Sequence, residues 1–292
     1  MGLVVKNITK AFGSNVAVDN LSFEMNSPGV FGLIGTNGAG KTTTIRVILG
    51  IMGQDCGEVR WNGKEVKRGT VNFGYLPEER GIYMKISVFE QLIYFGMLRG
   101  MTKQAAADSA LAYLNRFGIS EYKNTTAEKL SKGNQQKIQL IAAIIHDPDL
   151  IFMDEPFAGL DPLNTDMLAE LIYDLVKVGK YIIMSSHQMF TVEKFCDNII
   201  ILHKGKTLLK GNLREIKAGY GHTNLVVSAN ADILPFALAN KLELIAQLPE
   251  GDEYRIHGDV EANAFLSDLI NNGIYPTKFV KREPSLHEIF VE

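Results

Sequence analysis

The residues with the clearest chemistry form a glycine-rich octapeptide at positions 35–42, which reads Gly-Thr-Asn-Gly-Ala-Gly-Lys-Thr. It follows an apolar run at residues 30–34 and precedes a helix-like segment at residues 43–52. The spacing G-x-x-x-x-G-K-T between a strand and a helix is typical of a loop that binds phosphate. Glycines let backbone N–H groups turn inward around phosphate oxygens, and the helix N-terminus adds a partial positive charge.

Two side chains of this loop complete a site for a nucleoside triphosphate. Lys41 supplies a full positive charge for the β- and γ-phosphates, and the Thr42 hydroxyl is placed to ligate Mg²⁺. The predicted nucleotide contacts of this segment are Gly35, Thr36, Asn37, Gly38, Ala39, Gly40, Lys41, Thr42 and Thr43.

A second pair of polar residues follows the apolar run at residues 150–153. Asp154 and Glu155 stand where this predicted buried strand ends. In ATPases with a phosphate-binding loop the strand-end aspartate orients the Mg²⁺ shell, so we assign Asp154 to the metal. Glu155 can reach the water that attacks the γ-phosphate, and such general-base assistance contributes roughly 10²–10⁴ in rate.

The elements that must position these residues are short apolar strands that alternate with segments of helical spacing. This alternation predicts an α/β fold with a mostly parallel sheet. Together with the phosphate-binding loop and the acidic pair, it indicates a P-loop ATPase core. From about residue 86 to 147 the pattern is helical throughout, which predicts an inserted helical subdomain. The expected strands are residues 3–8, 30–34, 72–76, 150–153, 181–185 and 198–203.

After about residue 220 the pattern changes to a small β-α-β-β-α succession that follows a linker at residues 219–222. We therefore expect an ATPase domain at residues 1–220 and a small α+β accessory domain at residues 221–292. No catalytic constellation appears in the accessory domain, and its role stays open.

Composition limits the class of protein. The 292 residues carry 30 basic and 33 acidic side chains and a net charge of −3, which argues against a nucleic-acid partner. No apolar run approaches the ~18–20 residues that a spanning helix needs, and no signal peptide is expected. Cys56 and Cys196 lack the spacing of metal ligands or of a disulfide framework. Taken alone, the chain is expected to be a soluble cytosolic protein.

Residues 130–137 read L-S-K-G-N-Q-Q-K, which resembles the signature sequence of a known family. With the two nucleotide motifs they resemble the ATP-binding subunits of ABC transporters, over about residues 1–220. The resemblance implies ATP and Mg²⁺ as ligands and a head-to-tail dimer of ATPase subunits. In such a dimer Ser131, Gly133 and Asn134 would face the ATP of the other subunit. Ser131 is also suited to cap the helix that follows it.

Three further positions match this family. Asp161, in A-G-L-D at residues 158–161, matches the loop that couples the two sites of the dimer. His187 matches the histidine that contacts the γ-phosphate and holds Glu155 and the water. Phe12 matches the aromatic residue that stacks on adenine, although a core phenylalanine at a strand end is nearly as good a reading.

The chain also departs from the family pattern. Glu78 stands where a Mg²⁺-contacting glutamine is usual, and Lys132 and Asn134 replace a small residue and a glutamine of the signature. A carboxylate can still ligate Mg²⁺, so Glu78 stays a metal candidate. Lys132 could lie near the partner's ATP or point to solvent. With P-E-E-R-G-I-Y at residues 77–83, these changes resemble a bacterial efflux branch of sodium and antibiotic-type exporters.

The resemblance predicts an ATP-hydrolysing subunit that powers a separate transmembrane permease. The narrower resemblance to the efflux branch implies that the transport is export. Such a subunit would lie in the cytoplasm, on the inner face of the membrane through the permease. The rival is a soluble ABC-type ATPase of the DNA-repair or translation-factor kind. Repair ATPases place a long coiled coil between the nucleotide motifs, and translation factors carry two ATPase heads, whereas this chain has a compact insertion and one head.

Overall fold

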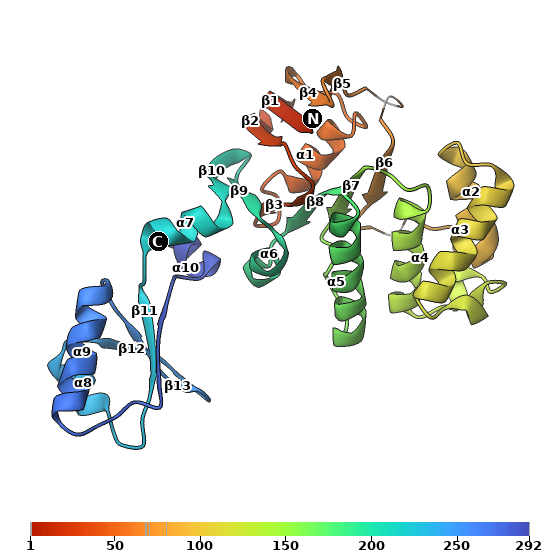
Figure 1. Ribbon diagram of the computed structural model, residues 1–292. Coiled ribbons are helices and arrows are strands. Elements are labelled where there is room, and N and C mark those ends of the chain that lie inside the picture. Colours follow the sequence, from red (N-terminus) through yellow and green to blue (C-terminus); the bar gives the residue numbers. More distant parts are fainter. Residues whose placement is uncertain (1, 68, 70, 80, 292) are drawn as a thin grey trace. The chain divides into compact units, whose positions relative to one another are not determined.

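A computed structural model describes residues 2–67, 69, 71–79 and 81–291 of the chain (Figure 1). The chain folds as two compact units, Met1–Lys210 and Gly211–Glu292. Helix α7 (Leu213–Tyr220) therefore groups with the second unit, whereas the predicted boundary at residue 220 falls at the end of this helix. No helix in the described part of the chain has the length and apolar character needed to cross a bilayer.

A six-stranded sheet in the order β10-β9-β3-β8-β7-β6 forms the centre of the first unit. The pairings β9–β3, β3–β8, β8–β7 and β7–β6 are parallel, which confirms the predicted α/β class. Strands β3 and β7 are buried along their whole length, as expected of a parallel sheet covered on both faces. The strands are β3 (Gly29–Gly35), β6 (Phe73–Leu76), β7 (Leu150–Asp154), β8 (Tyr181–Ser186), β9 (Asn198–His203) and β10 (Lys206–Asn212).

A second sheet is antiparallel and has the strand order β2-β1-β4-β5. Strands β1 and β2 come before the first helix of the chain, and β4 and β5 come after it. The sequence predicts only the first half of β1 and does not predict β2. In β2 the alternation is irregular, because buried Val18 and Leu21 are three residues apart and the β1–β2 pairing has register shifts. Such bulges break the period of two by which strands are recognised. The strands are β1 (Leu3–Phe12), β2 (Asn15–Met25), β4 (Cys56–Trp61) and β5 (Lys64–Glu65).

The insertion between β6 and β7 is helical, as predicted, and lies beside the β6 edge of the sheet (Figure 1, yellow to light green). It contains α2 (Val88–Leu98), α3 (Lys103–Arg116) and α4 (Lys132–Ile144). The side chain of Ser131 accepts a hydrogen bond from the Asn134 N–H at 3.2 Å, which confirms Ser131 as the N-cap of α4. The other helices of this unit are α1 (Lys41–Ile48), α5 (Pro162–Lys177) and α6 (Met189–Phe195).

His146 lies buried beyond the end of α4, with its Nε2 3.1 Å from the Phe73 carbonyl oxygen. Burial lowers the pKa of His146 from its ordinary value to about 4, against 6.5 for a free histidine. The unfolded chain therefore binds a proton at His146 at a higher pH than the folded chain does. The contribution of His146 to the free energy of unfolding is complete above about pH 6.5 and is lost as the pH falls toward 4.

Replacing His146 by glutamine is expected to remove this pH dependence. Urea unfolding near pH 7.5 and near pH 5 should show that the wild type loses roughly 2 kcal/mol more than His146→Gln over this interval, from the two pKa values. Equal losses in the two chains would mean that His146 is not held neutral by the fold.

The second unit has the succession β11-α8-β12-β13-α9-β14, a split βαβ arrangement in which the sheet order is β12-β13-β11-β14. All three pairings are antiparallel, and helices α8 and α9 share one apolar core with this sheet. The first five of these elements agree with the sequence prediction, whereas β14, a short strand of mostly charged residues, was not predicted. The bounds are β11 (Asn224–Ser228), α8 (Leu234–Ala239), β12 (Glu243–Leu248), β13 (Gly251–Arg255), α9 (Asp259–Asn271), β14 (Lys278–Arg282) and α10 (Leu286–Val291).

Candidate active site

The glycine-rich loop joins β3 to α1 and has the conformation of a phosphate cradle. Gly40 has φ 104°, and a Cβ there would lie 2.2 Å from the Ala17 carbonyl oxygen, so only glycine fits. Gly40 is also the N-cap of α1, and no side chain caps this helix. The first N–H groups of α1 are therefore open to an anion. Of the remaining loop residues, Thr36, Asn37 and Gly38 are exposed and Ala39 is buried.

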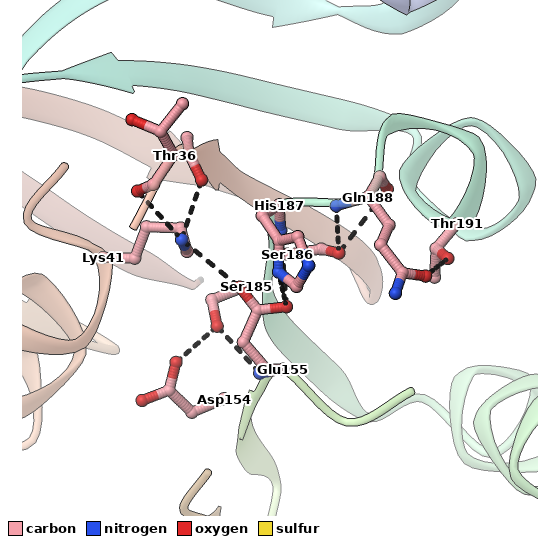
Figure 2. Close-up of polar contacts among 10 residues, drawn as sticks. Thr36, Lys41, Asp154, Glu155, Ser185, Ser186, His187, Gln188 and Thr191 are labelled. Atoms are coloured by element: carbon pink, nitrogen blue, oxygen red, sulfur yellow. Dashed lines mark hydrogen bonds and ion pairs between the residues drawn. The ribbon is translucent and has the colours of Figure 1, made fainter. Parts of the chain in front are cut away.

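Lys41 is buried and crosses from this loop to the end of β7 (Figure 2). Its Nζ donates to the carbonyl oxygens of Gly35 at 2.7 Å and Thr36 at 3.3 Å. The same ammonium lies 3.2 Å from Glu155 Oε1, in an ion pair whose side chains are both less than a tenth exposed. The structure thus brings the two motifs together as the sequence predicted.

Ser185 on β8 links the two acidic residues at the end of β7. Its Oγ donates to Asp154 Oδ1 at 2.5 Å and accepts from the Glu155 N–H at 3.0 Å (Figure 2). This bond supports the left-handed conformation of Glu155, whose φ is 50°. Ser185 is not among the site residues that the sequence predicts; the available signal was a serine near the end of a predicted strand, two residues before His187.

His187 holds the carboxylate of Glu155 from the other side. The Nδ1 of His187 is 2.9 Å from Glu155 Oε2, and the backbone N–H of His187 donates to the same oxygen at 3.3 Å. The Glu155 side chain is 5% exposed and the His187 side chain is 44% exposed. The imidazole therefore connects the buried carboxylate to the open side of the site.

Two cavities meet at these residues. A cavity of about 470 Å³ is lined by the glycine-rich loop and Phe12, and a cavity of about 220 Å³ is lined by α4 and the residues after β6 and β7. Glu78 and Glu155 line both cavities. Phe12 is 49% exposed at the end of β1, so it is a wall of the larger cavity and not a core residue. Arg80, part of the branch motif at residues 77–83, lies outside the described residues.

The signature residues lie at the start of α4, next to the start of α5. A Cβ on Gly133 would meet Asn164 Nδ2 at 2.8 Å, so glycine permits this close approach. Asp161 is the N-cap of α5, and its two carboxylate oxygens accept from Asn164 at 3.0 Å and 2.6 Å. The backbone N–H of Asn164 lowers the pKa of Asp161, which keeps this carboxylate ionised.

The residues present fit a magnesium ion that is bound together with phosphate. Asp154 Oδ2 is buried and has no hydrogen-bond partner among the described residues, so it is available to a ligand sphere. Within the described ranges no three His, Cys, Asp or Glu side chains gather as a complete metal cage. Mg²⁺ commonly takes one or two protein oxygens and fills the rest of its sphere with phosphate and water, and Thr42, Asp154 and Glu78 can supply such oxygens.

A phosphate cradle with a lysine, a strand-end Asp-Glu pair and a histidine on the glutamate together define a P-loop ATPase site. Two family models match the chain: one described as "ABC transporter" at residues 18–158, and one described as "ATP-binding protein DrrA1-3-like, C-terminal domain" at residues 211–292.

Individual relatives agree with these models. The uncharacterized ABC transporter ATP-binding protein YhaQ of Bacillus subtilis (strain 168) is 41% identical over 291 residues, 99% of this chain and 97% of YhaQ. The linearmycin resistance ATP-binding protein LnrL of the same organism is 32% identical over 77% of this chain and 73% of LnrL. A solved ATP-binding subunit of an ABC transporter has a TM-score of 0.70 and 30% identity, covering 75% of this chain and 93% of that one.

The chain belongs to the ATP-binding proteins of ABC transporters, and its second unit to the DrrA-like C-terminal domains. Proteins of this family are ATPases that bind ATP and act with separate transmembrane subunits. The resemblance seen in the sequence is thereby confirmed at the level of the family, and with it the assignment of the chain as the ATP-hydrolysing subunit of a transporter.

Proposed function

We propose that ATP is bound and hydrolysed at the cavity between the glycine-rich loop and Glu155. The observation that carries this proposal is the chain of contacts from Lys41 through Glu155 to His187. The N–H groups of Gly38 and of residues 40–43 and the Lys41 ammonium bind the phosphates, and Phe12 stacks on the adenine. An arriving phosphate competes with Glu155 for the Lys41 ammonium, because the same Nζ serves both groups.

In this proposal Glu155 is the general base. Oε2 is held by His187, whereas Oε1 has only its ion pair with Lys41 among the described contacts. When Lys41 turns to phosphate, Oε1 is free to accept a proton from the attacking water. His187 keeps the carboxylate in place and presents its imidazole to the γ-phosphate.

A bound Mg²⁺ would neutralise developing charge on the phosphates. We assign its protein oxygens to Thr42, Asp154 and Glu78. Ser185 orients Asp154 through a bond to Oδ1, which leaves Oδ2 for the ligand sphere. Ser185 is thus a positioning residue for both acids at the end of β7.

Ser185→Ala is expected to lower hydrolysis and to raise the Mg²⁺ concentration needed for half-maximal rate, by about tenfold or more. The buried Asp154 loses its hydrogen-bond donor, and the Glu155 N–H loses its acceptor. A Mg²⁺ titration of phosphate release measures this. Ser186→Ala is the matched control, because the Ser186 hydroxyl bonds only Gln188 among the described contacts. An unchanged Mg²⁺ dependence in Ser185→Ala would contradict the role given to Ser185.

We further propose that two ATPase subunits associate head to tail, each completing the other's site with Ser131, Gly133, Asn134 and Asp161. The N-terminus of α4 supports this, since its exposed Ser131 can meet an anion from another subunit. The head-to-tail orientation of the two subunits is taken from the family resemblance.

An exposed apolar surface on the helical insertion favours a membrane partner over the soluble ABC-type ATPases. Tyr83 packs on Tyr94 and Phe95 with ring centroids 6.0 Å and 5.7 Å apart, yet Tyr83 and Tyr94 are each about half exposed. Apolar side chains that gather in an exposed patch mark interaction surfaces. The other exposed members are Met84, Ile86, Met97 and Leu98. We propose that this surface binds a permease that holds the subunit on the inner face of the membrane.

The direction of transport is proposed to be export. The linearmycin resistance ATP-binding protein LnrL supports this, as do the resembling motif at residues 77–83 and the DrrA-like second unit. The net charge of −3 favours a protein partner over nucleic acid.

Tyr94→Asp is expected to abolish binding of the permease and to leave ATP hydrolysis by the isolated chain unchanged, because a carboxylate is costly to bury in an apolar interface. Affinity purification of the full chain from detergent-solubilised membranes of its host should recover a multi-helix membrane protein with the wild type and not with Tyr94→Asp. Tyr173→Asp, at an equally exposed tyrosine on α5, is the control and should retain the partner. Recovery of the same membrane protein with Tyr94→Asp would contradict the proposed surface.

A further inference from the structure

Three polar side chains form a stripe along one face of α4. Lys132, Gln136 and Gln139 are four and three residues apart, the spacing that aligns side chains on one helix face. All three line the 220 Å³ cavity, together with Glu78, Asp154 and Glu155. The signature helix therefore faces the acidic residues of its own subunit along this stripe.

The two glutamines hold the backbone that carries these acids. Gln139 Nε2 donates to the carbonyl oxygens of Pro77 at 2.8 Å and Glu79 at 3.0 Å, on either side of Glu78. Gln136 Nε2 donates to the Pro156 carbonyl oxygen at 3.0 Å, directly after Glu155. Because all three bonds are made from α4, this helix fixes the backbone positions of Glu78 and Glu155.

Among the described residues that line this cavity, Lys132 is the single cation, against the three carboxylates of Glu78, Asp154 and Glu155. Neither Lys132 nor Glu78 has a hydrogen bond or ion pair with another residue that the structure describes. Both are exposed along part of their length, so their charged ends can move within the cavity. The attraction between opposite charges in such a partly enclosed space exceeds that in open water.

Both positions depart from the pattern of the resembling family, and the two departures have opposite charge. A carboxylate at 78 adds one negative charge beside the triphosphate, and an ammonium at 132 adds one positive charge to the wall of the same cavity. We propose that Lys132 is a positioning residue for Glu78 of the same subunit: its ammonium offsets the carboxylate and holds it at the nucleotide site. The proposal rests on the proposed role of Glu78 beside Mg²⁺ and ATP.

This arrangement differs from the two readings of Lys132 that the sequence left open. A lysine that meets the partner's ATP acts on nucleotide directly and needs a dimer. A lysine that points to solvent has no partner at all. A lysine that acts through Glu78 matters only while residue 78 is charged, and it does so in a single subunit.

A double-mutant cycle on nucleotide binding separates these readings. Four full-length chains are compared: wild type, Lys132→Met, Glu78→Gln and the double variant. Dissociation constants for fluorescent ATP are measured with EDTA and again with Mg²⁺, at a chain concentration where sedimentation shows monomers. Lys129→Met, an equal change of charge at an exposed position three residues earlier, is the control.

Lys132→Met should raise the dissociation constant for metal-free ATP by about three- to fivefold, the upper range for a partly exposed pair. The same substitution in the Glu78→Gln background should change it by less than about twofold. Lys132→Arg should restore wild-type binding, and Lys129→Met should leave it unchanged.

Equal losses in both backgrounds, no loss in either, or a loss seen only in dimers would each overturn the proposal. The Glu78→Gln chain alone tests the assumption beneath it. If that substitution leaves both dissociation constants unchanged, the proposed role of Glu78 fails, whereas a shift without coupling to Lys132 removes only the pairing.

Discussion

Glu155→Gln is expected to retain ATP and to release phosphate at least about a hundredfold more slowly than the wild type, the usual scale for loss of a general base. Glutamine keeps the size of the side chain and its contact with His187, so the site stays assembled. It cannot accept a proton from water. Steady-state phosphate release and equilibrium binding of ATP, measured on the same preparation, separate the two effects.

Glu170→Gln is the matched control for this change, because it removes one carboxylate from an exposed position of α5. Its phosphate release should equal that of the wild type. Rapid turnover by Glu155→Gln would show that another group activates the water, and the role proposed for Glu155 would be wrong.

Lys41→Met is expected to weaken ATP binding by about ten- to a hundredfold, since hydrogen bonds to charged groups contribute about 1.5–3 kcal/mol. The same change leaves the carboxylate of Glu155 buried without its cation. Breaking one side of a buried pair costs about 3–5 kcal/mol, so the free energy of unfolding should fall by about 3 kcal/mol.

The double variant Lys41→Met with Glu155→Gln distinguishes these two consequences. Removing the unpaired charge should restore most of the lost stability in urea unfolding, whereas ATP binding should stay weak. Normal ATP affinity in Lys41→Met would contradict the placement of the phosphates at this loop.

Of the two residues proposed as catalytic, Glu155 could be predicted from its place at a strand end, and His187 from the family resemblance. Glu155 and His187 follow apolar runs at the carboxyl ends of β7 and β8, which are neighbours in a parallel sheet. Polar residues at the ends of neighbouring parallel strands meet at one edge of the sheet, and this strand order, which the structure supplies, explains why the two residues lie together.

Residues that act through tertiary contacts could not be predicted in the same way. Ser185 is one of several polar residues at a strand end, and its two bonds depend on the register Asp154–Ser185 between β7 and β8. Gln136 and Gln139 read as ordinary polar positions of a helix, and their partners are backbone carbonyls some 20 and 60 residues away in sequence.

The antiparallel sheet was missed for a physical reason as well. The shifts in register between β1 and β2 remove the strict alternation that marks a strand. The role of Phe12 shows the consequence. Phe12 is exposed because it stands at the end of β1, where the chain turns to begin β2 at Asn15. A predicted strand that ends at residue 8 does not reach Phe12, so its exposure could not be predicted.

The fate of the γ-phosphate on the purified full chain tests the central claim most directly. After incubation with Mg²⁺ and ATP labelled at the γ-phosphate, the nucleotide that stays with the chain is separated and identified. We expect the wild type to carry ADP and to have released the label, and Glu155→Gln to carry intact labelled ATP. Retention of ADP with full release of label by Glu155→Gln would contradict the claim that this carboxylate drives hydrolysis.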